Sequence, residues 1–151
     1  MDNIARWNIR GLNWPNKQED VKIFSHDKGI GLVGLLETKI KEHNVQKEAV
    51  RIFPNWRWVH NFSLNPKGRI WLAWNPSSYH AHVLSVSDQM IHCKVSQIST
   101  SKMFYLSMIY GWNQESQRTS LWHDLTDIAQ HMDPAWCLMG DFNALASRTT
   151  A

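Results

Sequence analysis

The sequence has few cysteines, no long apolar run and no block of like charge, and each absence excludes a class of protein. Cys93 and Cys137 are the only two cysteines and form no CxxC pair, which excludes a disulfide-rich scaffold and predicts two buried, reduced thiols. No segment approaches 18 consecutive apolar residues, and no charged-then-apolar leader opens the chain. We therefore expect a soluble, intracellular protein that does not bind a membrane.

Lysine and arginine are scattered along the chain, and the net charge is only +3. This mild basicity is compatible with a polyanionic partner but gives weak support for one. With 43% hydrophobic and 19% charged residues in 151 positions, the composition predicts one globular domain with its own core. Nine tryptophans are many for this length, and we expect most of them to pack in the core, with base stacking as the alternative.

Apolar patterns predict strands that alternate with helices at both ends of the chain. Helical spacing and its terminators predict helices over residues 16–29, 41–53 and 113–132, the last ended by Pro134. Between the last two helices lie five short stretches rich in Trp, Val, Ile and Tyr, which predict an antiparallel meander. Further strands are predicted at residues 4–9, 30–37 and 135–143. This order favours an α/β sandwich of mixed sheets over a doubly wound parallel sheet.

Polar residues stand where several of the predicted strands end: Asn8, Glu37, Tyr110, Asp141 and Asn143. Strand ends at one edge of a sheet converge in space, and ligands of α/β folds bind there. Carboxylate and amide oxygens suit Mg²⁺ or Mn²⁺, which would polarise a phosphate oxygen. Taken singly, each of these residues is explained as well by a strand end that meets water.

Four segments strengthen this interpretation because they occur together and in order. "WNIRGL", "LLETK", "MIYGWN" and "MGDFNA" resemble the successive motifs of the endonuclease/exonuclease/phosphatase superfamily, which includes deoxyribonuclease I. "GRIWLAWN" and "RTSLWHDL" resemble the endonuclease domain of plant non-LTR retrotransposons. The resemblance implies a partial four-layer α/β-sandwich of mixed, largely antiparallel sheets. It also implies a metal-dependent DNA endonuclease without an organic cofactor, and a nuclear location.

The resemblance also implies roles for the five polar residues. Glu37 corresponds to the main ligand of Mg²⁺ or Mn²⁺, and Asn8 to the amide beside it. Tyr110 corresponds to the tyrosine that contacts the scissile phosphate. Asp141 corresponds to the aspartate that orients or deprotonates the attacking water, and Asn143 to the amide that holds the phosphate. The chemistry agrees, because a carboxylate can accept a proton and neutral amides can donate to phosphate oxygens.

Further expectations follow from the extent of the match. Arg10 is a candidate contact to the DNA backbone, although a loop arginine is more often only solvated. We expect residues 1–145 to be the N-terminal part of the family's domain and 146–151 to be a divergent polar tail, because the family's closing Ser-Asp-His motif is not found. A chain truncated in this way should have little activity and should self-associate through an exposed sheet face. A non-catalytic nucleic-acid-binding module and a decayed structural remnant are the alternatives.

Overall fold

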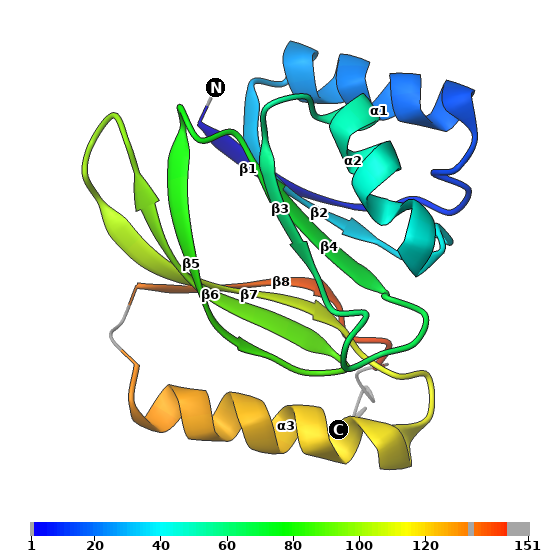
Figure 1. Ribbon diagram of the computed structural model, residues 1–151. Helices are drawn as coiled ribbons and strands as arrows, with labels where there is room; N and C mark the ends of the chain where they lie inside the picture. The colour runs from blue at the N-terminus through cyan, green and yellow to red at the C-terminus, as the bar shows by residue number, and fades with distance from the viewer. Residues whose placement is uncertain (1, 133–134, 145–151) are drawn as a thin grey trace, which may run out of the picture.

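The chain folds into four layers, with two β-sheets packed face to face and helices on the outside (Figure 1). The computed structural model describes residues 2–132 and 135–144. Helices α1 (Pro15–Asp27) and α2 (Val45–Ile52) lie on one outer face, and α3 (Glu115–Gln130) lies on the other. This confirms the predicted four-layer α/β sandwich.

The first sheet carries the strand order β1-β2-β4-β3. Its strands are β1 (Asn3–Asn8), β2 (Ile30–Leu36), β3 (Arg57–His60) and β4 (Ile70–Trp74). The β1 and β2 strands run parallel, while the β2–β4 and β3–β4 pairs are antiparallel. Every residue of β2 and of β4 is buried, because helices cover one face of this sheet and the second sheet covers the other. A short 3₁₀ turn (Glu42–Asn44) leads into α2.

The second sheet carries the order β5-β6-β7-β8. Its strands are β5 (Tyr79–Val86), β6 (Met90–Gln97), β7 (Met103–Tyr110) and β8 (Trp136–Asp141). The first three form an antiparallel meander, and β8 returns parallel to β7 after α3. Tyr110 at the end of β7 is paired with Asp141 at the end of β8. Two of the predicted site residues therefore reach the same end of the sheet.

A cluster of buried apolar residues from both sheets fills the space between them. Leu32 and Leu36 of β2 face Leu106 and Met108 of β7 there. Gly34 permits this close approach, because a side chain at that position would collide with Met108. A second cluster lies between the first sheet and helices α1 and α2, and a third lies beneath α3. No helix in the described part of the chain is long and apolar enough to cross a membrane.

Three expectations from the sequence are wrong. The five predicted meander strands exist, but β3 and β4 belong to one sheet and β5 to β7 to the other, because β4 pairs with β2 instead of β5. Cys93 is buried and Cys137 is exposed, because β8 is the outermost of the described strands of its sheet. The inner faces of the two sheets bury each other, so the exposed sheet face expected from the sequence is not found among the described strands. Both cysteines are free thiols, as predicted.

Smaller differences concern the last helix and the ends of the chain. Leu121 and Leu125 of the predicted stripe are buried, but Trp122 is 40% exposed and stacks on Phe142 at a centroid distance of 6.0 Å. The predicted helix stop at Pro134, the domain boundary at Leu145 and the tail 146–151 lie outside the described residues. Self-association stays a prediction.

Candidate active site

Glu37 lies directly after β2, where the chain turns away from the sheet. Its backbone adopts a left-handed conformation with φ of 57°, which is uncommon for a residue other than glycine and is found at functional sites. The Glu37 amide donates to the carbonyl of Arg69 over 2.8 Å, so the β2–β4 pairing fixes the turn. The side chain is only 5% exposed, and a carboxylate buried to this degree requires charged or hydrogen-bonding partners.

Three cations supply those partners on one carboxylate oxygen. Arg69 Nη1 lies 2.9 Å from Glu37 Oε1, Arg10 Nη2 lies 3.2 Å from it, and Lys39 Nζ lies 3.5 Å from it. Arg69 is itself largely buried, with 14% of its side chain exposed, whereas Arg10 is 74% exposed. The Arg69 guanidinium also lies over the ring of Tyr110, 5.4 Å from its centroid. Arg69 is therefore the buried member of the group, and Arg10 is the exposed one.

The electrostatics keep Glu37 ionised and Tyr110 protonated. Burial raises the pKa of Glu37, but hydrogen bonds from Arg10 and Tyr110 and the charges of Arg10 and Lys39 outweigh it, so the pKa lies below its usual value. Burial, the hydrogen bond to Glu37 and the charge of Glu37 raise the pKa of Tyr110 above its usual value. At neutral pH the tyrosine hydroxyl is therefore a hydrogen-bond donor beside a carboxylate.

Asp141 and Asn143 approach the same tyrosine from the second sheet. Asp141 Oδ1 accepts a hydrogen bond of 2.9 Å from the amide of Asn143, and Asn143 Nδ2 donates to the carbonyl of Gly111 over 2.6 Å. The Asn143 side chain also lies near enough to the Tyr110 hydroxyl to lower the pKa of the tyrosine. Gly111 permits this arrangement, because a side chain there would collide with the carbonyl of Phe142. Tyr110 thus lies near both Glu37, which follows β2, and Asn143, which follows β8.

The loop that follows Tyr110 is fixed by buried polar side chains. Arg118, which is 9% exposed, donates from Nη1 to the carbonyls of Trp112 and Asn113 over 3.0 and 2.7 Å. Gln89, 1% exposed, accepts from the amide of Trp112 over 2.9 Å. These contacts anchor the start of α3 to the end of β7, which keeps the tyrosine and its neighbours in place. Arg118, the arginine downstream of "MIYGWN", therefore holds this loop in place.

The structure brings most of the predicted site residues together. Glu37, Tyr110, Asn143 and Asp141 form one connected group. Asn8 is exposed at the end of β1, where its Cα is paired with that of Leu36, the residue before Glu37. It is therefore at the same end of the sandwich, although no side-chain hydrogen bond joins it to the group among the described residues. Arg10, predicted to contact DNA, lies against Glu37.

Sequence reasoning missed Arg69 and Lys39. Both lie within 4 Å of Glu37 and so determine its charge environment. Arg69 stands inside the motif "GRIWLAWN", directly after the glycine of a Pro-Lys-Gly turn. That turn predicts the strand start but gives no sign that the arginine faces Glu37, because the register between β2 and β4 decides it.

Solved structures share this arrangement of strands and helices. The endonuclease domain of TRAS1, a telomere-specific non-LTR retrotransposon, matches 93% of this chain with a TM-score of 0.69 at 11% identity. An endonuclease/exonuclease/phosphatase family protein from Bacteroides thetaiotaomicron matches 97% with a TM-score of 0.71 at 11% identity. This chain has the endonuclease/exonuclease/phosphatase fold. TDP2 of D. rerio, solved with a single-strand DNA product, also has this fold and matches 95% of the chain with a TM-score of 0.66 at 14% identity.

The similarity to these endonuclease/exonuclease/phosphatase structures concerns the fold, because the identities are low. This chain spans 61%, 65% and 61% of the lengths of the three matched chains. No protein-family model and no curated protein matches the sequence.

The residues near Glu37 would fit a magnesium site in which the protein supplies few of the ligands. Mg²⁺ commonly takes one or two carboxylates from the protein and completes its octahedron with water and substrate phosphate. Glu37 offers one carboxylate at the rim, and Asn8 offers a neutral amide oxygen from the adjacent strand end. The described residues contain no cluster of three or more His, Cys, Asp or Glu side chains. This donor set lacks the three or four protein ligands that Zn²⁺ requires.

Proposed function

We propose that this chain forms part of a metal-dependent phosphodiester hydrolase domain that acts on DNA. The observation that carries the proposal is the group formed by Glu37, Tyr110, Asn143 and Asp141, which unites residues from both sheets at one end of the sandwich. A carboxylate for a metal, a protonated hydroxyl, an amide and a second carboxylate are the groups that water attack on a phosphodiester requires.

Each residue has a defined task in this proposal. Glu37 and Asn8 would hold Mg²⁺ or Mn²⁺, which when bound polarises a phosphate oxygen and stabilises the departing oxygen. Asp141 accepts a proton from the attacking water. Tyr110, kept protonated by its raised pKa, donates a hydrogen bond to a phosphate oxygen. Asn143 contributes a second donor to the phosphate from its amide.

Three neighbouring cations support an anionic substrate. Arg10 and Lys39 are 74% and 50% exposed and can turn from Glu37 to a phosphate, whereas the largely buried Arg69 stays beside the carboxylate. DNA is the substrate that we propose, because the TRAS1 domain is an endonuclease and the TDP2 structure contains a DNA product. The motifs that resemble plant non-LTR retrotransposons support a retroelement origin and, with it, action in the nucleus.

The test is nicking of supercoiled plasmid in Mn²⁺ or Mg²⁺, together with Mn²⁺ binding followed by electron paramagnetic resonance. We expect slow nicking by the wild-type chain. Glu37→Gln should lose both Mn²⁺ binding and nicking, and Asp141→Asn should retain Mn²⁺ binding but lose nicking. Nicking that persists in Asp141→Asn, or none by a wild-type protein shown to be folded, would contradict the proposal.

A non-catalytic nucleic-acid-binding module is the second candidate. The observation that favours it is the neutralisation of Glu37 by three cations, which leaves an excess of positive charge around the one buried carboxylate of the site. Such a module would bind DNA in EDTA and would show no nicking in any metal. The plasmid assay and a binding assay in EDTA together separate the two candidates.

A further inference from the structure

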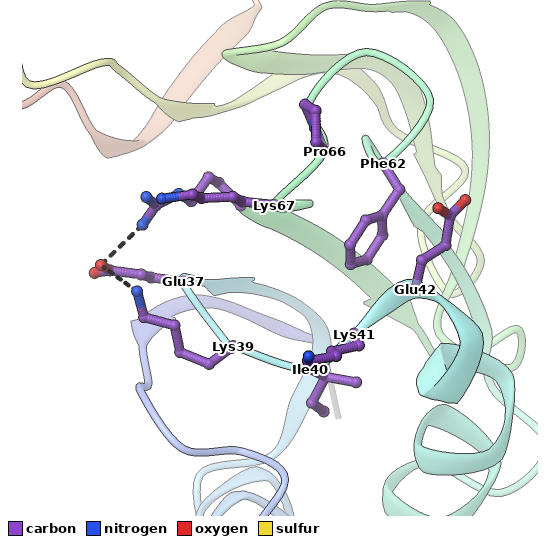
Figure 2. Close-up of a pocket in the computed structure, with 9 residues that line it drawn as sticks. Glu37, Lys39, Ile40, Lys41, Glu42, Phe62, Pro66 and Lys67 are labelled. Carbon is purple, nitrogen blue, oxygen red and sulfur yellow. Dashed lines mark hydrogen bonds and ion pairs between the residues drawn. The ribbon is translucent and has the colours of Figure 1, made fainter.

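A pocket of about 390 Å³ opens beside Glu37 (Figure 2). Its size is within the range of small-ligand pockets, roughly 300–1,000 Å³. One wall is the segment between β2 and α2, which contributes Lys39, Ile40 and Lys41. The opposite wall is the loop between β3 and β4, which contributes Pro66 and Lys67.

The chemistry of the lining combines a positive rim with an apolar floor. The pocket is lined by four cationic side chains, Lys39, Lys41, Lys67 and Arg69, and by two carboxylates, Glu37 and Glu42. The lining therefore has an excess of positive charge. Ile40 and Phe62 form the floor and are 3% and 6% exposed. Figure 2 shows the Phe62 ring between the two walls.

Two of the pocket's lysines form no ion pair with another described residue of the chain. Lys39 and Arg69 pair with Glu37. By contrast, Lys41 and Lys67 are exposed, and neither takes part in an ion pair within the described part of the chain. They stand on opposite walls of one pocket, where both can reach an anionic ligand.

The wall that carries Lys67 is held rigidly. Asn61 is fully buried, donates to the carbonyls of Ser87 and Asp88 over 3.2 and 3.1 Å, and accepts from the amide of Ile70 over 3.1 Å. Asn65, 1% exposed, donates to Asp88 and accepts from the amide of Lys67 over 3.0 Å.

Close packing completes this wall. Gly68 follows with φ of 49°, and a side chain there would collide with the ring of Phe62. A loop fixed in this way presents its lysine in a preorganised position, which lowers the entropy cost of binding.

We propose that this pocket binds the nucleotide next to the scissile phosphate, with its phosphate between Lys41 and Lys67 and its base on the floor of Ile40 and Phe62. The identity of the ligand as nucleic acid rests on the proposed function, and the pocket adds which part of the strand is held. Glu37 lines the pocket and also belongs to the catalytic group. A strand with one phosphate at Glu37 therefore places the adjoining nucleotide in this pocket.

The experiment measures binding of a fluorescein-labelled oligodeoxythymidylate by anisotropy, in EDTA so that no cleavage occurs. The test variant is the double substitution Lys41→Glu, Lys67→Glu. The control is Lys94→Glu, Lys102→Glu, which changes the net charge equally at two exposed lysines. Lys94 lies in the middle of β6, and Lys102 precedes β7 at the end opposite Tyr110. Circular dichroism and thermal melting establish that both double variants are folded.

We expect the pocket variant to bind about tenfold or more weakly at roughly 50 mM salt. Its plot of log affinity against log salt should lose about 0.7 units of slope, since the pocket holds one phosphate and each single-strand phosphate contact contributes about 0.7. The control pair should stay close to wild type. An abasic oligomer of the same length should bind more weakly than oligothymidylate to the wild-type chain, because it offers no base to the floor.

Three results would overturn the proposal. The first is wild-type affinity in the pocket variant, and the second is an equal loss in both double variants. The third is equal binding of abasic and thymidylate oligomers, which would leave a phosphate site without a base. Failure of the proposed function is recognised separately: plasmid nicking would be absent while oligonucleotide binding still depends on Lys41 and Lys67.

Discussion

Replacing Gly140 by alanine is expected to loosen the strand that carries Asp141. Gly140 has φ of 137°, a conformation that side chains rarely adopt, and a Cβ there would collide with the backbone of Ile109 on β7. The unfavourable conformation costs about 1–3 kcal/mol. The collision costs about 1–3 kcal/mol more, because backbone atoms cannot turn aside. Together these give about 2–6 kcal/mol, out of a typical total stability of about 5–15 kcal/mol.

Urea denaturation followed by tryptophan fluorescence measures this loss. With a denaturant slope of about 2 kcal/mol/M, the midpoint should fall by about 1–3 M. Gly11→Ala is the matched control, because Gly11 also has a positive φ of 78° but its nearest neighbour is the exposed side chain of Trp14, which can move. We expect about 1 kcal/mol for the control. A Gly140→Ala midpoint no lower than that of the Gly11→Ala control would refute the role of the Ile109 contact.

Three further predictions concern buried polar groups and thiols. Burial lowers the pKa of His92, so as the pH falls the unfolded chain binds a proton before the folded chain does. The free energy of unfolding should therefore decrease as the pH drops below about 6.5. In urea titrations at about pH 5–7, His92→Asn should show a smaller decrease. Native protein should expose one thiol to Ellman's reagent, Cys137, since Cys93 is buried with a pKa of about 12; two reactive thiols would contradict this. Asn61→Ala should lower the free energy of unfolding, measured by heat or urea, by about 2–4 kcal/mol, because it leaves the carbonyls of Ser87 and Asp88 and the amide of Ile70 without their hydrogen-bond partner. A decrease below about 1 kcal/mol would show that other contacts hold the loop.

Local patterns predicted most of the elements because their causes are local. Helical spacing in the stretch before Pro54 and the apolar run of β2 depend on neighbours in the sequence, and both elements were found. The division of the five middle strands between two sheets was missed. Whether β4 pairs with β2 or with β5 depends on long-range contacts that no sequence window contains. The exposure of Cys137 was missed for the same reason, since an apolar strand has the same pattern at an edge as in the middle.

The candidate site divides in a similar way. Polar residues that end apolar strands were visible in the sequence, and Glu37, Tyr110, Asp141 and Asn143 do come together. The cations around Glu37 could not be predicted, because Arg69 reaches it only through the register of β2 against β4. The roles of the site residues, the metal and the DNA substrate stay proposals.

The candidate site forms only when the two sheets dock, because its residues come from both of them. Glu37 follows β2 of the first sheet, whereas Tyr110 and Asp141 end strands of the second sheet and Asn143 follows β8. A folding intermediate with both sheets formed but not yet docked would have nearly complete secondary structure and no site at all. The raised pKa of Tyr110 arises from burial and from Glu37 of the other sheet, so the tyrosine acquires it only when the two sheets dock.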